Sequence, residues 1–151
     1  MNNLTRNAQV EIWAKSIGGF LLNFGVLELD SILWIRNLGG VAAGQSGLKK
    51  GFGDRIDIVI ALIRKSDWTQ DRKQSALDLW LEVKTLAKTR NTIAHNPLFT
   101  NEKFGILQVG IINVKNMKGI GPFLLEPLSL EDINLGGIRV CELFDLLQKL
   151  R

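Results

Sequence analysis

Apolar residues recur every three or four positions over most of the chain, which is the spacing of helices that face a core. The first such series spans residues 6–37, and two more span residues 53–66 and 70–95. Pro97 sets the end of the third, because proline disfavours helical geometry in the residue before it. A fourth series follows Ser129 and closes the chain. The pattern therefore predicts four helices.

Two stretches interrupt the helical spacing. Residues 38–53 contain six glycines and predict a mobile surface loop. Residues 104–128 are rich in β-branched and aromatic residues, with NMKGIG as turn material between two apolar runs. We therefore expect a mainly α, single-domain protein over residues 1–151, with a small β-hairpin insertion before the C-terminal helix.

The most apolar stretch, residues 17–35, approaches the length of a membrane span. It contains Asn23, Glu28 and Asp30, which are costly in hydrocarbon, so we expect a buried core helix and no membrane partner. The first residues lack a basic segment followed by an apolar run and a cleavage site, so no signal peptide is expected. These features favour a cytoplasmic protein.

Composition narrows the chemistry further. Nineteen Lys and Arg against 15 Asp and Glu give a net charge of +4, which favours an anionic partner without requiring one. One cysteine, Cys141, excludes an intramolecular disulfide, and one Cys with one His cannot supply a zinc site within a monomer. We expect no metal and no cofactor, and we interpret Cys141 as an inert core thiol.

Arg90 occupies a position where the helical pattern calls for an aliphatic residue. It belongs to a row of core-facing positions in the helix predicted over residues 70–95. The other members of this row are Ala76, Leu79, Val83 and Leu86 before Arg90, and Ile93 after it. A guanidinium there needs a partner, because an unpaired buried charge is expensive. The alternatives are an ion pair with an acid such as Glu28, a head that extends to solvent, or a ligand.

A second row on the same helix is polar and basic. It comprises Lys84, Lys88, Asn91 and His95, and it suits a phosphate backbone. Asn91 and His95 are four residues apart, so the amide can orient the imidazole. An ideal helix separates Arg90 from His95 by about 140°, so the two converge only if the helix ends or distorts near His95. Otherwise His95 is a helix cap or a solvent-exposed residue.

The segment RNTIAH at residues 90–95 resembles the signature of the HEPN superfamily of helical domains, whose ribonuclease members carry Arg, four to six residues and then His. Arg90, Asn91 and His95 match the Arg, the polar residue after it and the His. The resemblance implies a four-helix HEPN-like bundle and a metal-independent endoribonuclease that acts as a homodimer. It also implies a role as a toxin or in phage defence, with RNA as substrate and an antitoxin protein as a possible partner.

The residue types agree with that chemistry. In RNA cleavage by 2′-OH attack, a base takes the hydroxyl proton and an acid protonates the departing 5′-oxygen, which leaves a 2′,3′-cyclic phosphate. An imidazole exchanges protons near neutral pH, and a guanidinium offers fixed donors to phosphate oxygens. With one histidine per chain, two imidazoles meet only in a homodimer. We therefore assign catalysis to Arg90, Asn91 and His95, and RNA binding to Lys84 and Lys88.

Other signals are weaker. GGVAAGQS at residues 39–46 is close to a phosphate-binding loop, but Gln45 replaces the essential lysine. Lys49, Lys50 and Arg55 would extend a basic rim, although solvated loop charges explain them better. Of the four tryptophans, Trp13 and Trp80 fit core rows, and Trp68 beside a turn stays open.

Two other functions remain compatible with the sequence. One is a catalytically silent HEPN-type module that binds a nucleotide or a protein. The other is a structural helix-bundle adaptor in which Arg90 is held in a buried ion pair. RNA cleavage in EDTA, sizing chromatography and the melting temperature of Arg90→Ala separate the three.

Overall fold

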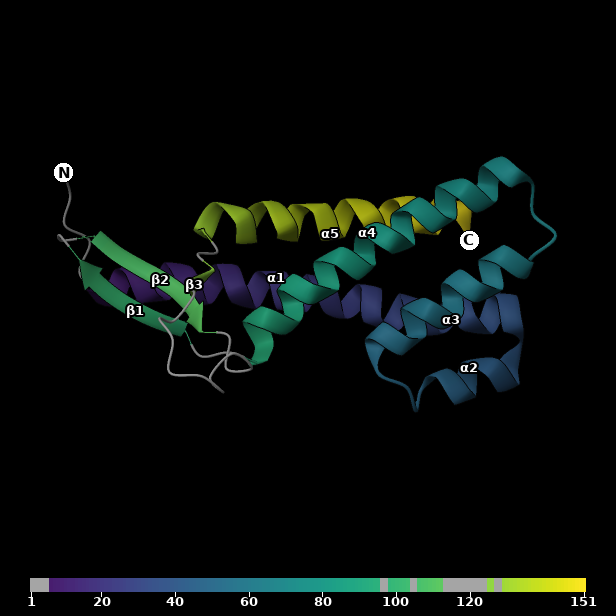
Figure 1. The fold of residues 1–151 in the computed structure, drawn as a ribbon, viewed down its shortest axis with the longest axis horizontal. Helices are drawn as coiled ribbons and strands as arrows, with labels where there is room; N and C mark the ends of the chain where they lie inside the picture. Colours follow the sequence, from purple (N-terminus) through teal and green to yellow (C-terminus); the bar gives the residue numbers. More distant parts are fainter. Residues whose placement is uncertain (1–5, 96–97, 104–105, 113–124, 127–128) are drawn as a thin grey trace.

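The computed structural model describes residues 6–95, 98–103, 106–112, 125–126 and 129–151. Within these residues the protein is mainly helical, which confirms the expected mainly α class (Figure 1). The helices are α1 (Arg6–Gly39), α2 (Val41–Gly47), α3 (Phe52–Lys65), α4 (Gln70–His95) and α5 (Leu130–Leu150). The strands are β1 (Leu98–Lys103), β2 (Ile106–Ile112) and β3 (Leu125–Glu126).

Helix α1 organises the core, since it packs against all four other helices. Its buried positions carry large apolar side chains, and α3, α4 and α5 each contribute a row of aliphatic residues to the same core. Trp34 of α1 lies edge-on to Trp80 of α4 and to Trp68, with ring centroids 5.8 Å apart in both pairs. The expected core position of Trp80 is confirmed, and Trp68 is part of the same aromatic cluster.

Helix α5 is fixed at its start and along its length. Ser129 and Asp132 form a reciprocal capping box, with the Ser129 hydroxyl accepting from the Asp132 backbone N–H at 3.0 Å. Arg139 donates two hydrogen bonds to Glu82 of α4, at 2.7 and 2.8 Å. The predicted helix start after Ser129 is confirmed. The two hydrogen bonds from the Arg139 guanidinium to Glu82 join α4 and α5.

The mobile loop predicted for residues 38–53 is wrong, because residues Val41–Gly47 form the short helix α2. Two of its glycines are buried against α1: a Cβ on Gly44 would lie 2.8 Å from the Arg36 Cβ, and one on Gly47 would lie 3.1 Å from Ile35 Cδ1. Gly40 has φ +86°, which turns the chain between α1 and α2. These glycines allow close helix packing rather than mobility.

The expectation that residues 17–35 form a buried core helix holds for one face of α1 only. Its opposite face is open, with Leu22 and Leu29 exposed at 78% and 59%. By length and composition, residues Ala8–Gly39 also meet the criteria for a membrane-spanning helix, and 28% of the most apolar window is buried. The helical core therefore covers only part of the most apolar window of α1.

The three strands form one antiparallel sheet in the order β1-β2-β3. The β1–β2 register runs from Leu98 opposite Ile111 to Lys103 opposite Ile106. Strand β1 precedes the predicted β range of residues 104–128, and the predicted turn at residues 116–121 lies outside the described residues. Figure 1 draws the sheet at the end of the molecule where α1 begins.

Candidate functional site

Arg90 lies on the core-facing side of α4 and is paired across the helix interface. Its Nη2 is 2.9 Å from Oε1 of Glu28 on α1, and the two side chains are 28% and 27% exposed. Of the alternatives given for Arg90, the ion pair with Glu28 is thus confirmed. Because both heads keep some contact with solvent, the pair holds the guanidinium in place while one side stays accessible to a ligand.

Asn91 is exposed and supports Arg90 directly. Its side-chain oxygen accepts a hydrogen bond of 3.1 Å from Arg90 Nη1. The amide oxygen is therefore directed to the guanidinium, and not to the imidazole four residues later as the sequence suggested. Arg90 is held by a carboxylate on one nitrogen and by an amide oxygen on the other, which restricts its rotamers.

His95 is the exposed last residue of α4. The helix continues through His95, so within one chain the imidazole stays about 140° around the axis and about 7.5 Å along it from Arg90. The distortion needed to bring the two together is not present in α4. Among the described residues, none makes a hydrogen bond or ion pair with His95.

The two lysines of the polar row have different surroundings. Lys84 Nζ lies 2.5 Å from Oδ1 of Asp57 on α3, with side-chain exposures of 43% and 60%. This pair uses Lys84 to link α4 with α3 and reduces its availability to RNA. Lys88, one turn later, is exposed and forms no ion pair with any residue that the structure describes.

Arg55 belongs to the site, although the sequence favoured a solvated loop charge at this position. It lies on α3 and not on a loop, its side chain is only 11% exposed, and its Nη2 is 3.9 Å from Glu28 Oε2. Its guanidinium also lies over the Phe52 ring, 5.6 Å from the centroid. The spacing of Phe52, Arg55, Val59 and Leu62 by threes and fours was the available signal, because it places Arg55 on the edge of the core row.

Glu28 therefore lies between two guanidiniums that come from different helices. The cluster of Glu28, Arg55 and Arg90 carries one negative and two positive charges. The Nε of Arg55 is buried and has no hydrogen-bond partner among the described atoms. A buried donor without an acceptor is costly, so the cluster lacks one hydrogen-bond acceptor and carries an excess of one positive charge.

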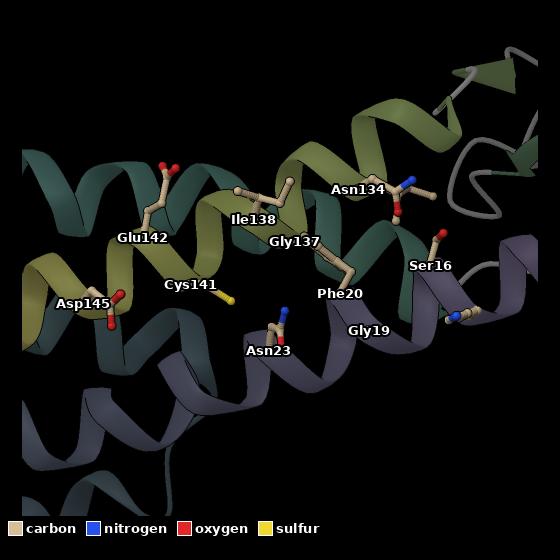
Figure 2. A pocket seen from close by; sticks show the side chains of 12 residues that line it. Ser16, Gly19, Phe20, Asn23, Asn134, Gly137, Ile138, Cys141, Glu142 and Asp145 are labelled. Carbon is tan, nitrogen blue, oxygen red and sulfur yellow. The ribbon is translucent and has the colours of Figure 1, made fainter.

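A hollow of about 490 Å³ lies between α1 and α5 (Figure 2). Its walls include Phe20, Asn23 and Ile138, and its rim carries Glu142 and Asp145. No residue of α3 or α4 lines it, and its charged lining residues are one base, Lys15, and two acids, Glu142 and Asp145, so its charge does not favour a phosphate. This hollow is thus a poorer candidate for an RNA site than the arginine cluster.

Cys141 also lines this hollow. The cysteine is exposed, so its interpretation as a core thiol is wrong. The apolar stripe of α5 is satisfied without it, because Val140 and Leu143 on either side of it are buried.

The residues that the structure describes contain no group of three or more His, Cys, Asp or Glu placed to hold a metal ion. Comparison of the chain with protein-family models, curated proteins and solved structures found no match. The functional argument consequently rests on the geometry of Arg90 and its neighbours.

Proposed function

We propose that the protein is a metal-independent endoribonuclease of HEPN-like architecture, acting in the cytoplasm as a homodimer in a toxin or phage-defence role. In this proposal α1, α3, α4 and α5 correspond to the four-helix bundle, and α2 and the strands are additions to it. The observation that carries the proposal is the pairing of Arg90 with Glu28, which fixes a partly exposed guanidinium on the same helix as an exposed terminal histidine.

Each residue has a defined task in the proposed reaction. A base removes the proton of the ribose 2′-OH, the 2′-oxygen bonds to phosphorus, and an acid protonates the departing 5′-oxygen, which leaves a 2′,3′-cyclic phosphate. His95 exchanges one of these protons, which is worth ~10²–10⁴-fold in rate. Arg90, held by Asn91, stabilises the charge that develops on the phosphorane oxygens. Lys88 contributes to backbone binding, and Lys84 contributes less because of Asp57.

Arg55 belongs to the same proposed phosphate site. The long 3.9 Å separation of its Nη2 from Glu28 leaves donor capacity on this guanidinium beside Arg90. An entering phosphate would supply the acceptor that Glu28 alone does not provide to both arginines. This also explains the placement of a largely buried guanidinium next to another one.

The test is cleavage of single-stranded RNA by purified protein in EDTA, with the ends analysed for cyclic phosphate. We expect Arg90→Ala and His95→Ala each to lose at least about 100-fold in rate with little change in melting temperature for His95→Ala. Lys65→Ala, an exposed charge at the end of α3, is the matched control and should cleave normally.

Other outcomes select other functions. Binding of RNA without cleavage would favour the silent HEPN-type module. A melting temperature that falls strongly in Arg90→Ala, in a protein that neither binds nor cleaves RNA, would favour the structural adaptor, with the pair of Arg90 and Glu28 serving only the fold.

A further inference from the structure

The hollow between α1 and α5, which we call the α1–α5 groove, has a floor of small and buried residues. Helix α1 contributes Gly19 and Phe20 to this floor, and α5 contributes Gly137. Phe20 is buried, and a Cβ on Gly19 would meet nothing within 4 Å. Ile138 of α5 also lines the groove, with 58% of the residue exposed. The groove therefore offers apolar surface and room for the close approach of another backbone.

The two helices that form the walls of the groove run in the same direction. A Cβ on Gly137 would lie 3.8 Å from the Phe20 Cα, and further along both helices Gln148 donates a 2.8 Å hydrogen bond to Asp30. The contacts thus advance together on α1 and α5, as Figure 1 also shows. A third helix that lies in the groove can pack against both walls over several turns.

The groove carries opposite charges at its two ends. Counted from the contact at Gly137, Lys15 lies five residues earlier on α1 and Asp145 lies eight residues later on α5. At 1.5 Å per residue, these positions are about 20 Å apart along the groove. Both are exposed, and neither forms an ion pair with any residue that the structure describes. The other acid of the groove, Glu142, is paired with Arg139 at 2.8 Å.

We infer that the α1–α5 groove binds an amphipathic helix of a partner protein, which lies parallel to α1 and α5. A helix of about 13 residues spans the distance between the two charges. Acidic residues are favoured in the first turn of a helix and basic residues in the last turn. A helix with that pattern places its acid beside Lys15 and its base beside Asp145 when it runs in the direction of the two walls. Its apolar side then packs on the floor of the groove.

Length and charge favour such a helix over other occupants. A small ligand is too short to contact both Lys15 and Asp145. An anionic membrane surface would meet two acids and one base in the groove, so its charge is not attracted. The inference does not depend on the proposed ribonuclease, because no residue of α3 or α4 lines the groove and the binding is measured without RNA.

The probe is a fluorescent helical peptide of about 13 residues with leucines along one side, Glu in its first turn and Lys in its last turn. Fluorescence anisotropy with the full chain should give a dissociation constant of about 100 μM or tighter. A peptide with Glu and Lys exchanged should bind about five-fold more weakly, because two attractive contacts become repulsive. In the double variant of Lys15→Glu and Asp145→Lys, the preference between the two peptides should be reversed.

Gly19→Leu tests the location, since its side chain would occupy the floor of the groove. It should weaken binding of the probe at least about ten-fold. Gly25→Leu is the matched control, because Gly25 is also exposed on α1 with nothing within 4 Å of an added Cβ, but does not line the groove. Cys141 is the chain's single cysteine, and Figure 2 shows its sulfur directed into the groove. Saturating probe should therefore slow alkylation of Cys141 at least about five-fold.

Circular dichroism of each variant checks that its helices are intact. The inference is overturned if the probe does not bind at about 1 mM, if Gly19→Leu and Gly25→Leu bind it equally, or if the double variant keeps the wild-type preference. Loss of dimerisation or of vesicle binding in Gly19→Leu, with probe binding unchanged, would likewise overturn it and identify a second copy or a membrane as the occupant.

Discussion

At the scale of single residues, Asp30 is the most constrained ionisable group in the core. Only 1% of the residue is exposed, and its Oδ1 accepts a 2.8 Å hydrogen bond from Gln148 and another from Arg151. Burial raises the pKa of the Asp30 carboxyl, and the hydrogen bonds from Gln148 and the charge of Arg151 oppose that increase only in part. Asp30 consequently fastens the end of α5 to α1 at a cost in desolvation.

This cost predicts a pH dependence of stability. Because the pKa of Asp30 is higher in the folded than in the unfolded chain, the folded protein binds this proton more tightly. Ionisation therefore removes stability as the pH rises from the ordinary carboxyl range through the raised value, and the full cost remains above it. The free energy of unfolding of wild type relative to Asp30→Asn should decline between about pH 4 and pH 7.

Urea denaturation of both proteins across that range measures this difference. Taking the difference cancels the opposite contributions of Glu82 and Asp132, whose pKa values are lowered by hydrogen bonds. A difference that stays constant or grows with pH would show that Asp30 ionises as easily in the folded protein as in the unfolded chain.

At the scale of elements, long periodic segments were predictable and short close contacts were not. The helices α1, α3, α4 and α5 follow from apolar spacing, because each buries a row of residues that recurs with the helical period. Helix α2 does not follow from apolar spacing, since glycine has a low helix propensity and adds no apolar side chain to a helical row. The role of a glycine in α2 depends on which residue lies beside it. Only the approach of Gly44 to Arg36 explains the glycines of residues 38–53.

The candidate site divides in the same way. The pairing of Arg90 with Glu28 was one of the alternatives that the sequence offered, because an arginine in an apolar row needs an acid, a ligand or contact with solvent. The burial of the Arg55 side chain was not predictable, since it depends on how α3 packs on α1. The position of His95 relative to Arg90 likewise depends on where α4 ends, which the sequence bounds only through Pro97.

The packing of α2 gives a prediction of its own. In an exposed helix, replacing glycine by alanine stabilises by up to about 1 kcal/mol. At Gly44 the added Cβ would lie 2.8 Å from Arg36 Cβ and 3.3 Å from its backbone Cα, neither of which is the end of a flexible side chain. Gly44→Ala should therefore destabilise the protein by roughly 1–3 kcal/mol, measured by urea denaturation.

Gly53→Ala is the matched control for Gly44→Ala. Gly53 is also helical, but a Cβ there would meet nothing within 4 Å. Its stability should equal or slightly exceed that of the wild type. Equal stabilities for the two variants would mean that α2 does not pack closely on α1.

At the scale of the whole molecule, one chain separates the two groups that the proposed reaction must combine. Arg90 points between α1 and α3, while His95 lies at the exposed end of α4, about 140° around the helix axis. The second copy in the proposed homodimer would resolve this separation, because it can bring His95 of one protomer to Arg90 of the other. The proposed active site is then shared, and each dimer contains two of them.

A shared site predicts complementation between two inactive variants. Arg90→Ala and His95→Ala, mixed in equal amounts and allowed to exchange subunits, should form heterodimers as about half of all dimers, each with one intact pair of Arg90 and His95. Because each heterodimer has one working site of two, the mixture should recover about a quarter of the wild-type cleavage rate. If the mixture cleaves RNA no faster than the separate variants while the heterodimer is present, both groups act within one chain, and the end of α4 must rearrange when RNA binds.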